Sequence, residues 1–289
     1  SFDGSAIHTL NSDSHLIVGN FVGTNSAGDT ALGNLHGIRL DNSTGTTIGG
    51  SAPADRNLIS GNSNIGVYVF SGGNNTISGN YIGLNATGTS SLGNVTGLYI
   101  QDSANNTLGG TAAGAGNVTS GNSQSGINLA GAATAGTNIH GNLIGTNAAG
   151  TAAVGNTYGI YVSANAVTIG GTTAGTRNII SGNASYGMWL VSGAGTGTTV
   201  EGNYIGTDIS GQNAIANGVV GIEIASINNT IGGNTAAQRN VISGSASGYG
   251  IDIQNVITGA NTIQGNYIGI AADGATAVAN SIGIRVYES

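Results

Sequence analysis

The chain has 289 residues, 54 of them Gly, and only 6% are charged, with 5 Lys and Arg against 12 Asp and Glu for a net charge of −7. A nucleic-acid partner requires a basic stripe, which this composition excludes. The lack of Cys excludes disulfides and Cys-based metal sites. No apolar run reaches about eighteen residues, so we expect no membrane insertion.

A short phrase recurs along the whole chain at intervals of 60, 62, 61 and 63 residues. It reads GNFVGT from Gly19, GNYIGL from Gly79, GNLIGT from Gly141, GNYIGT from Gly202 and GNYIGI from Gly265. Between the copies lies a related phrase: RNLISGN from Arg56, GNVTSGN from Gly116, RNIISGN from Arg177 and RNVISGS from Arg239. Such a period predicts stacked units that bury their apolar faces against each other, so we expect residues 1–289 to form a single domain.

Each unit contains two sets of three short segments that alternate like β-strands. The first segments begin at Gly37, Gly66, Gly97, Gly126, Gly159, Gly187, Gly221, Gly250 and Gly283. The second segments end at Ile48, Ile77, Leu108, Ile139, Ile169, Val200, Ile231 and Ile263. The third segments have their second apolar position at Val22, Ile59, Ile82, Thr119, Ile144, Ile180, Ile205, Ile242 and Ile268.

Three strands in a constant order predict a coil in which each strand pairs in parallel with its copy one turn later. The fold class is therefore all-β, a three-sheet parallel solenoid of about nine turns with aliphatic columns inside. Truncating a column residue to Ala is expected to cost about 2–5 kcal/mol. Thr119 is the one polar residue of the third column, and we expect a weak spot there.

An Asn precedes every third strand, where a sharp corner is needed. Asn tolerates the left-handed backbone of such a corner, and stacked Asn amides can bond to one another along the axis while half buried. We therefore predict an Asn ladder formed by Asn20, Asn57, Asn80, Asn117, Asn142, Asn178, Asn203, Asn240 and Asn266. On turns with long loops an aromatic residue follows this Asn, and we expect Phe21, Tyr81, Tyr204 and Tyr267 to pack under the neighbouring loop.

The solenoid with its Asn ladder resembles the right-handed, single-stranded parallel β-helix of the pectate-lyase-like superfamily. The phrases GNYIGT, NTIGG and RNVISGN are most similar to repeats of large secreted or surface-anchored bacterial and archaeal β-helix proteins. The resemblance covers essentially the whole chain and implies an extracellular or cell-surface location. It specifies the fold far more closely than the function.

Outward positions of the first strands carry an aromatic stripe made of Tyr68, Tyr99, Tyr161 and Trp189. In the lyases and hydrolases that this chain resembles, the substrate groove lies along that sheet, so the stripe is a candidate glycan-binding surface. The alternative is that the aromatic rings shield the sheet or meet a neighbouring chain.

Glu223 and Asp252 lie one turn apart on the same column, which places their carboxylates ~5 Å apart and would suit a retaining glycosidase pair. They are weak catalytic candidates, because the related lyases use a Lys or Arg base with an Asp cluster, and related epimerases use an Asp-Pro-Asp-Gly motif. Neither set is found here. We therefore expect a solvated pair and a chain that is not an enzyme, with a polysaccharide lyase or hydrolase as the alternative.

Cofactors and metals are not expected. The four His residues have no metal-ligand spacing, and the calcium-binding nonapeptide repeat is missing. Asp29, Asp208 and Asp273 fall in the long loops, where a lone acid is normally solvated, so calcium binding is a minor alternative.

Both ends of the predicted coil present open strand edges without a cap helix. We expect flanking domains or further copies of the chain to cover them, and Ser1 in place of Met indicates a processed or excised segment. The preferred hypothesis is a non-catalytic structural β-solenoid, either a fibre subunit or the stalk of a surface protein. A glycan-binding adhesin is the second hypothesis and a polysaccharide-degrading enzyme the third.

Overall fold

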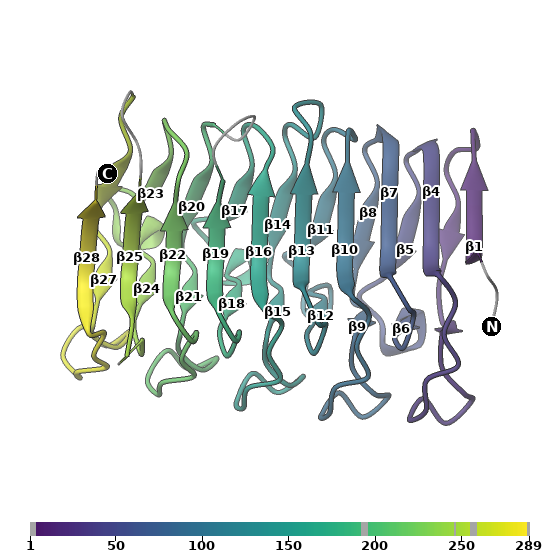
Figure 1. Ribbon diagram of the computed structural model, residues 1–289, viewed down its shortest axis with the longest axis horizontal. Helices are drawn as coiled ribbons and strands as arrows, with labels where there is room; N and C mark the ends of the chain where they lie inside the picture. Colours follow the sequence, from purple (N-terminus) through teal and green to yellow (C-terminus); the bar gives the residue numbers. More distant parts are fainter. Residues whose placement is uncertain (1–3, 192–195, 246, 255–258, 288–289) are drawn as a thin grey trace.

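The computed structural model describes residues 4–191, 196–245, 247–254 and 259–287. The chain winds as an elongated coil, and the strands of its first sheet run side by side and parallel along its length (Figure 1). Every strand pairing in the described residues joins a strand to its copies one turn before and one turn after, in parallel. The predicted all-β, three-sheet solenoid is therefore confirmed, and the described residues contain no α-helix.

Within the described residues the first sheet has ten strands. They are β1 (Ser5–Leu10), β4 (His36–Thr44), β7 (Ile65–Gly73), β10 (Thr96–Gln101), β13 (Ser125–Ala130), β16 (Tyr158–Ser163), β19 (Tyr186–Leu190), β22 (Val220–Ile224), β25 (Tyr249–Gln254) and β28 (Ile282–Tyr287). All nine predicted first segments lie in these strands, and β1 adds a tenth.

The described part of the second sheet has nine strands. They are β2 (Leu16–Ile17), β5 (Thr47–Gly49), β8 (Thr76–Ser78), β11 (Thr107–Gly109), β14 (Asn138–His140), β17 (Thr168–Gly170), β20 (Thr199–Glu201), β23 (Thr230–Gly232) and β26 (Thr262–Gln264). Short 3-10 helices follow three of them: η1 (Pro53–Asp55), η2 (Ala174–Thr176) and η3 (Ala236–Gln238).

The third sheet also has nine strands in the described chain, each of two residues. They are β3 (Phe21–Val22), β6 (Leu58–Ile59), β9 (Tyr81–Ile82), β12 (Val118–Thr119), β15 (Leu143–Ile144), β18 (Ile179–Ile180), β21 (Tyr204–Ile205), β24 (Val241–Ile242) and β27 (Tyr267–Ile268).

Aliphatic side chains from the three sheets fill the interior as continuous columns. Ile77 of the second sheet and Ile82 of the third are both fully buried, and one core cluster runs through the coil. Thr119 stands between Ile82 and Ile144 in the third column. It is fully buried, and its hydroxyl oxygen has no hydrogen-bond partner among the described residues. The location of the predicted weak spot is thus polar and unsatisfied.

The Asn ladder is present at all nine predicted positions. Each amide Nδ2 donates to the Oδ1 of the Asn one turn later at 2.9 to 3.1 Å, through all eight steps from Asn20 to Asn266. Asn142 also donates to the carbonyls of Leu108 and His140, so its amide is fully used. The interior ladder residues are completely buried rather than half buried.

The local reason given for the ladder corner was wrong. The ladder Asn residues do not adopt the left-handed backbone; on the long-loop turns that conformation belongs to the Gly before each of them, such as Gly79 with φ 68° and Gly141 with φ 70°. Glycine takes this region at no steric cost. Asn is therefore required at the corner for its amide bonds and not for its backbone.

A second Asn ladder runs along the corner between the third and first sheets. Its Nδ2 to Oδ1 bonds of 2.9 to 3.1 Å connect Asn34, Asn62, Asn94, Asn122, Asn156, Asn183 and Asn217. The next position is Ser245, whose backbone N–H donates to Oδ1 of Asn280 at 3.0 Å. This ladder was not predicted from the sequence, although five of its seven Asn residues end a recurring SGN or LGN triplet and Asn156 ends a similar VGN.

Long loops follow the third strand on every second turn and project together from one side of the coil (Figure 1). Each loop is closed by an antiparallel bridge, as between Thr146 and Ala153. Successive loops also bond to each other; for example, Ala148 N–H donates to the carbonyl of Gly88 at 2.8 Å. The loops thus form their own axial stack over the third sheet.

An Arg–Tyr pair recurs beneath these loops. The Arg Cζ lies 4.1 Å from the Tyr ring centroid in the pairs Arg56–Tyr81, Arg177–Tyr204 and Arg239–Tyr267. Each Arg Nε also donates to the carbonyl of a Gly in the next turn, at 3.0 to 3.3 Å. A cation over a ring face contributes about 0.5–2 kcal/mol, so the pairs fasten neighbouring turns together.

Candidate functional site

The outward face of the first sheet brings the predicted site residues into one axial column. The strand register pairs each residue with its neighbour on the next turn, because parallel strands place equivalent positions side by side. The column runs His8, Arg39, Tyr68, Tyr99, Asn128, Tyr161, Trp189, Glu223, Asp252 and Arg285.

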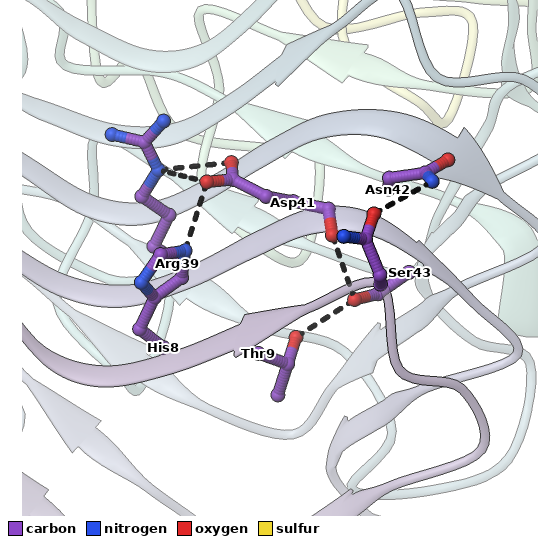
Figure 2. Close-up of polar contacts among 7 residues, drawn as sticks. His8, Thr9, Arg39, Asp41, Asn42 and Ser43 are labelled. Carbon is purple, nitrogen blue, oxygen red and sulfur yellow. Dashed lines mark hydrogen bonds and ion pairs between the residues drawn. The ribbon is translucent and has the colours of Figure 1, made fainter.

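The N-terminal end of the column is an ionic network centred on Asp41 (Figure 2). Arg39 Nε donates to both carboxylate oxygens of Asp41 at 2.9 Å, and His8 Nε2 lies 2.8 Å from Oδ2. Burial acts to raise the pKa of Asp41, but the bonds from Arg39 and His8 outweigh it and hold the pKa below its usual value. Asp41 therefore stays ionised and links two turns.

Tyr68 and Tyr99 stack face to face along the axis. Their ring centroids are 5.2 Å apart with an interplanar angle of 10°. Arg39 lies over the Tyr68 ring at 5.1 Å, and the Tyr68 hydroxyl donates to Gln101 Oε1 at 2.7 Å. Ring faces are the surfaces on which a sugar would stack, and here they are turned toward other residues of the column.

Trp189 sits within a cluster of three tyrosines. Its ring centroid lies 5.4 Å from Tyr158, 5.3 Å from Tyr161 and 5.4 Å from Tyr186. Two of these contacts are edge-to-face, a favourable arrangement for aromatic pairs. The indole Nε1 is buried and has no hydrogen-bond partner among the described residues. Asn128 separates this cluster from the Tyr68–Tyr99 pair, so the stripe is interrupted.

Glu223 and Asp252 are register partners, as predicted, but they are not solvated. Glu223 is 4% exposed and Asp252 is 1% exposed. Arg285 Nε donates to Asp252 Oδ1 at 2.8 Å, its Nη2 bonds Oδ2, and Gln254 Nε2 donates to Oδ2 at 2.7 Å. Arg285 also stacks on Tyr249 at 4.0 Å. The prediction of a solvated pair was wrong, because the next turn supplies a cation that covers Asp252.

The two carboxyl groups have opposite protonation behaviour. Burial, reinforced by the nearby charge of Asp252, raises the pKa of Glu223 from 4.5 to about 7. Burial also acts to raise the pKa of Asp252, but the bonds from Arg285 and Gln254 outweigh it and lower the pKa. Glu223 Oε2 has no hydrogen-bond partner among the described residues. The arrangement is an ionised Asp–Arg pair beside a carboxyl group that is partly protonated near neutral pH.

Metal ligands are not gathered anywhere in the described part of the chain: no three His, Asp or Glu side chains are placed to hold one ion. The loop acids instead bond their own loops. Asp208 accepts from Asn213 Nδ2 and the Ser210 hydroxyl, and Asp273 accepts from the Thr276 hydroxyl. Burial acts to raise the pKa of Asp208, but these side-chain bonds outweigh it, and the pKa of both Asp residues is lowered.

The pairing of Asp252 with Arg285 was not predicted from the sequence. Arg285 follows Asp252 in the outward column, and opposite charges one turn apart were the available signal. No helix in the described residues is long and apolar enough to cross a membrane.

No family model and no curated protein matches this chain. Among solved structures, it is similar to the Dettilon tailspike protein, with a TM-score of 0.52 and 19% identity over 98% of this chain. The chain spans 55% of the length of that tailspike.

Two further similar structures have lower TM-scores of 0.46. One is the A-module of a mannuronan C-5 epimerase from Azotobacter vinelandii, at 16% identity, covering 89% of this chain and 73% of that one. The other is an alginate lyase from a Paenibacillus species, at 15% identity, covering 92% and 99%. The three parallel sheets and the likeness to the tailspike protein show the parallel β-helix fold that the sequence predicted.

Proposed function

We propose that this chain is a rigid, non-catalytic structural segment of an extracellular or cell-surface protein. The observation that carries the proposal is the continuous axial pairing of buried polar groups. Eight consecutive amide bonds connect the first Asn ladder, and six more connect the second. Each additional turn repeats the same bonds, so the coil acts as a straight spacer.

The outward column supports the same function. Arg39 is bonded to Asp41, Tyr68 is stacked on Tyr99, and Asp252 is covered by Arg285. These groups use their polar atoms and ring faces on neighbouring turns. Such lateral bonding stiffens the first sheet and leaves little of it free to hold a substrate.

Stalk and fibre are the two forms of this proposal. In a stalk, flanking segments of the same protein continue the columns and ladders; in a fibre, another copy does so. Immunogold electron microscopy of the producing cells, with antibodies to this chain, distinguishes them. Straight projections from the cell surface indicate a stalk, and filaments labelled along their length indicate a fibre. Label confined to the cell interior would contradict both.

A glycan-binding adhesin is the second candidate, favoured by the Trp189 cluster. Trp189 is half-buried on the outward face, and its Nε1 donor has no partner among the described residues. It is the only Trp of the chain, so its fluorescence reports directly on this site. The candidate predicts a spectral shift with an oligosaccharide and loss of glycan-array binding in Trp189→Ala. Equal array signals for the two proteins would exclude this site.

A polysaccharide lyase or hydrolase acting through Glu223 and Asp252 is the least supported candidate. Both carboxyl groups are almost completely buried, and Arg285 occupies both oxygens of Asp252. A nucleophile or a base must reach its substrate. Any depolymerising activity of the chain should therefore survive in Asp252→Asn, and loss of activity in a folded Asp252→Asn protein would restore this candidate.

A further inference from the structure

Three departures from the repeat coincide on the third sheet. Gly116 stands where the equivalent phrases have Arg56, Arg177 or Arg239, and Leu143 stands where three of the other long-loop turns have Tyr. Ile209 occupies the loop position held by Ala148 in the preceding long loop and by Ala in two others. The one Arg–Tyr pair missing from the series is thus the pair that Gly116 and Leu143 would have made.

The missing pair leaves a groove beneath the long loops. Two adjoining cavities of about 280 and 260 Å³ share Gly114, Gly116, Gly141, Leu143 and Ile209 as lining residues. Arg177 lines one cavity and Arg56 lines the other, so each part of the groove has its own Arg beside the shared residues. Ile209 lines both cavities and is 51% exposed.

The backbone holds this groove open. A Cβ atom on Gly116 would lie 1.9 Å from the carbonyl oxygen of Gly141, far inside van der Waals contact. An Arg at this position would therefore require the two turns to move apart. The groove therefore depends on how closely these two turns approach each other, and not only on the missing Arg side chain.

The charges of the two lining Arg residues are available to a ligand. Arg39 and Arg285 are paired with Asp41 and Asp252, whereas Arg56 and Arg177 form no ion pair with any described residue. In each of Arg56 and Arg177, Nε donates a hydrogen bond to a backbone carbonyl and the guanidinium group lies over a Tyr ring. Their terminal nitrogens have no hydrogen-bond partner in the described chain, so they can donate to an anion.

We propose that this groove is a binding site for a small carboxylate carried on an aromatic ring. The ring lies against Leu143 and Ile209, in the space that a Tyr side chain fills on other turns. The carboxylate accepts hydrogen bonds from Arg177, whose planar guanidinium matches carboxylate geometry. Leu143, Ile179 and Ile209 give the groove apolar surface, which favours an aromatic ring over a sugar because sugar hydroxyls would lose water there.

Isoleucine methyl NMR with benzoate as the probe tests the proposal, because Ile179 and Ile209 line the groove. Benzoate should shift both methyl resonances, and neither benzyl alcohol nor glucuronate should do so at the same concentration. Absence of shifts with benzoate would overturn the proposal. Equal shifts with benzyl alcohol would overturn the charge requirement, and stronger binding of glucuronate would overturn the assignment of the ring.

Two Arg variants supply a matched comparison. Arg177→Gln and Arg239→Gln each remove one stacked pair and one bond to a Gly carbonyl, but only Arg177 lines the groove. Arg177→Gln should weaken benzoate about tenfold or more, and Arg239→Gln should leave it within about twofold. Equal effects of the two variants would contradict the site.

A filled variant tests the groove without altering its charges. Leu143→Tyr combined with Ile209→Ala recreates the packing of Tyr81 against Gly88 and Ala148 on the earlier turn. This protein should fold and no longer bind benzoate. Retained binding would place the ligand elsewhere and overturn the proposal.

Discussion

Replacing Thr119 by Val should stabilise the coil. Thr119 is completely buried in the third column, and its hydroxyl has no hydrogen-bond partner among the described residues. Burying an unpaired hydroxyl costs about 1–3 kcal/mol. Val keeps the branched shape at Cβ and removes the polar atom, so we expect a gain of about 1–2 kcal/mol in the free energy of unfolding.

The neighbouring turns indicate that a larger residue also fits. On three successive turns, the Cγ2 atom of the third-column residue lies next to a Gly of the first sheet. Ile82 Cγ2 faces Gly66, Thr119 Cγ2 faces Gly97 and Ile144 Cγ2 faces Gly126. Ile at 119 would therefore place its Cγ2 in the same position and its longer branch in the core. The free energy of unfolding of Thr119→Ile should therefore equal that of Thr119→Val or exceed it by up to ~1 kcal/mol. Thr119→Ala should lower the free energy of unfolding, because it leaves a cavity.

Native-state hydrogen exchange is the suitable assay, because a solenoid can open locally and a single unfolding midpoint can average over its turns. The amides of β12 and of the two turns beside it should exchange more slowly in Thr119→Val than in the wild type. A urea titration reports the global effect. Faster exchange around β12, or a lower midpoint in Thr119→Val, would refute the reasoning, since it would mean that the hydroxyl contributes a bond.

Three further predictions concern the ladders and the buried acid. Asn142→Ala leaves buried partners unpaired on both sides, so it should lower stability by about 3–5 kcal/mol in urea unfolding; an unchanged midpoint would contradict the ladder's role. Ser245→Asn should join Asn217 to Asn280, complete the second ladder and raise stability by about 1 kcal/mol, whereas a loss would show that the corner lacks room. Because the pKa of Glu223 is raised to about 7, its stabilising contribution is complete below pH ~4.5 and is lost as the pH rises through 7, by roughly 1–2 kcal/mol after screening. Glu223→Gln should remove this fall, and an unchanged pH profile would exclude Glu223 as its source.

The fold was accessible from the sequence because its information is periodic. The nine Asn residues of the first ladder recur together with the residues beside them. Because the same residues return on every turn, the arrangement that pairs them all is one in which equivalent residues lie next to each other along the axis. The second ladder obeyed the same logic through Asn62 and Asn122, but the SGN phrase resembles an ordinary turn. Its amide bonds became apparent only when the corner was seen to bury those side chains completely.

The candidate site was less accessible because its properties depend on orientation. Sequence position placed Tyr68 beside Tyr99 but gave no ring angle, and that angle decides whether the faces meet each other or the solvent. Likewise Glu223 and Asp252 were expected at a solvated surface. Their burial arises from side chains on the flanking turns, including Arg285, whose reach is not visible in a one-dimensional pattern.

The central claim is that about thirty residues make one turn and that equivalent positions rise along a common axis. Spin-label distances test it directly, because the chain has no Cys of its own and the outward Thr column of the second sheet accepts labels in register. Cys at Thr47 paired with Cys at Thr107, Thr168 or Thr230 spans two, four or six turns. We predict narrow distributions near ~10, ~19 and ~29 Å, rising about 4.8 Å per turn. Distances that do not increase linearly with the number of turns would contradict the account.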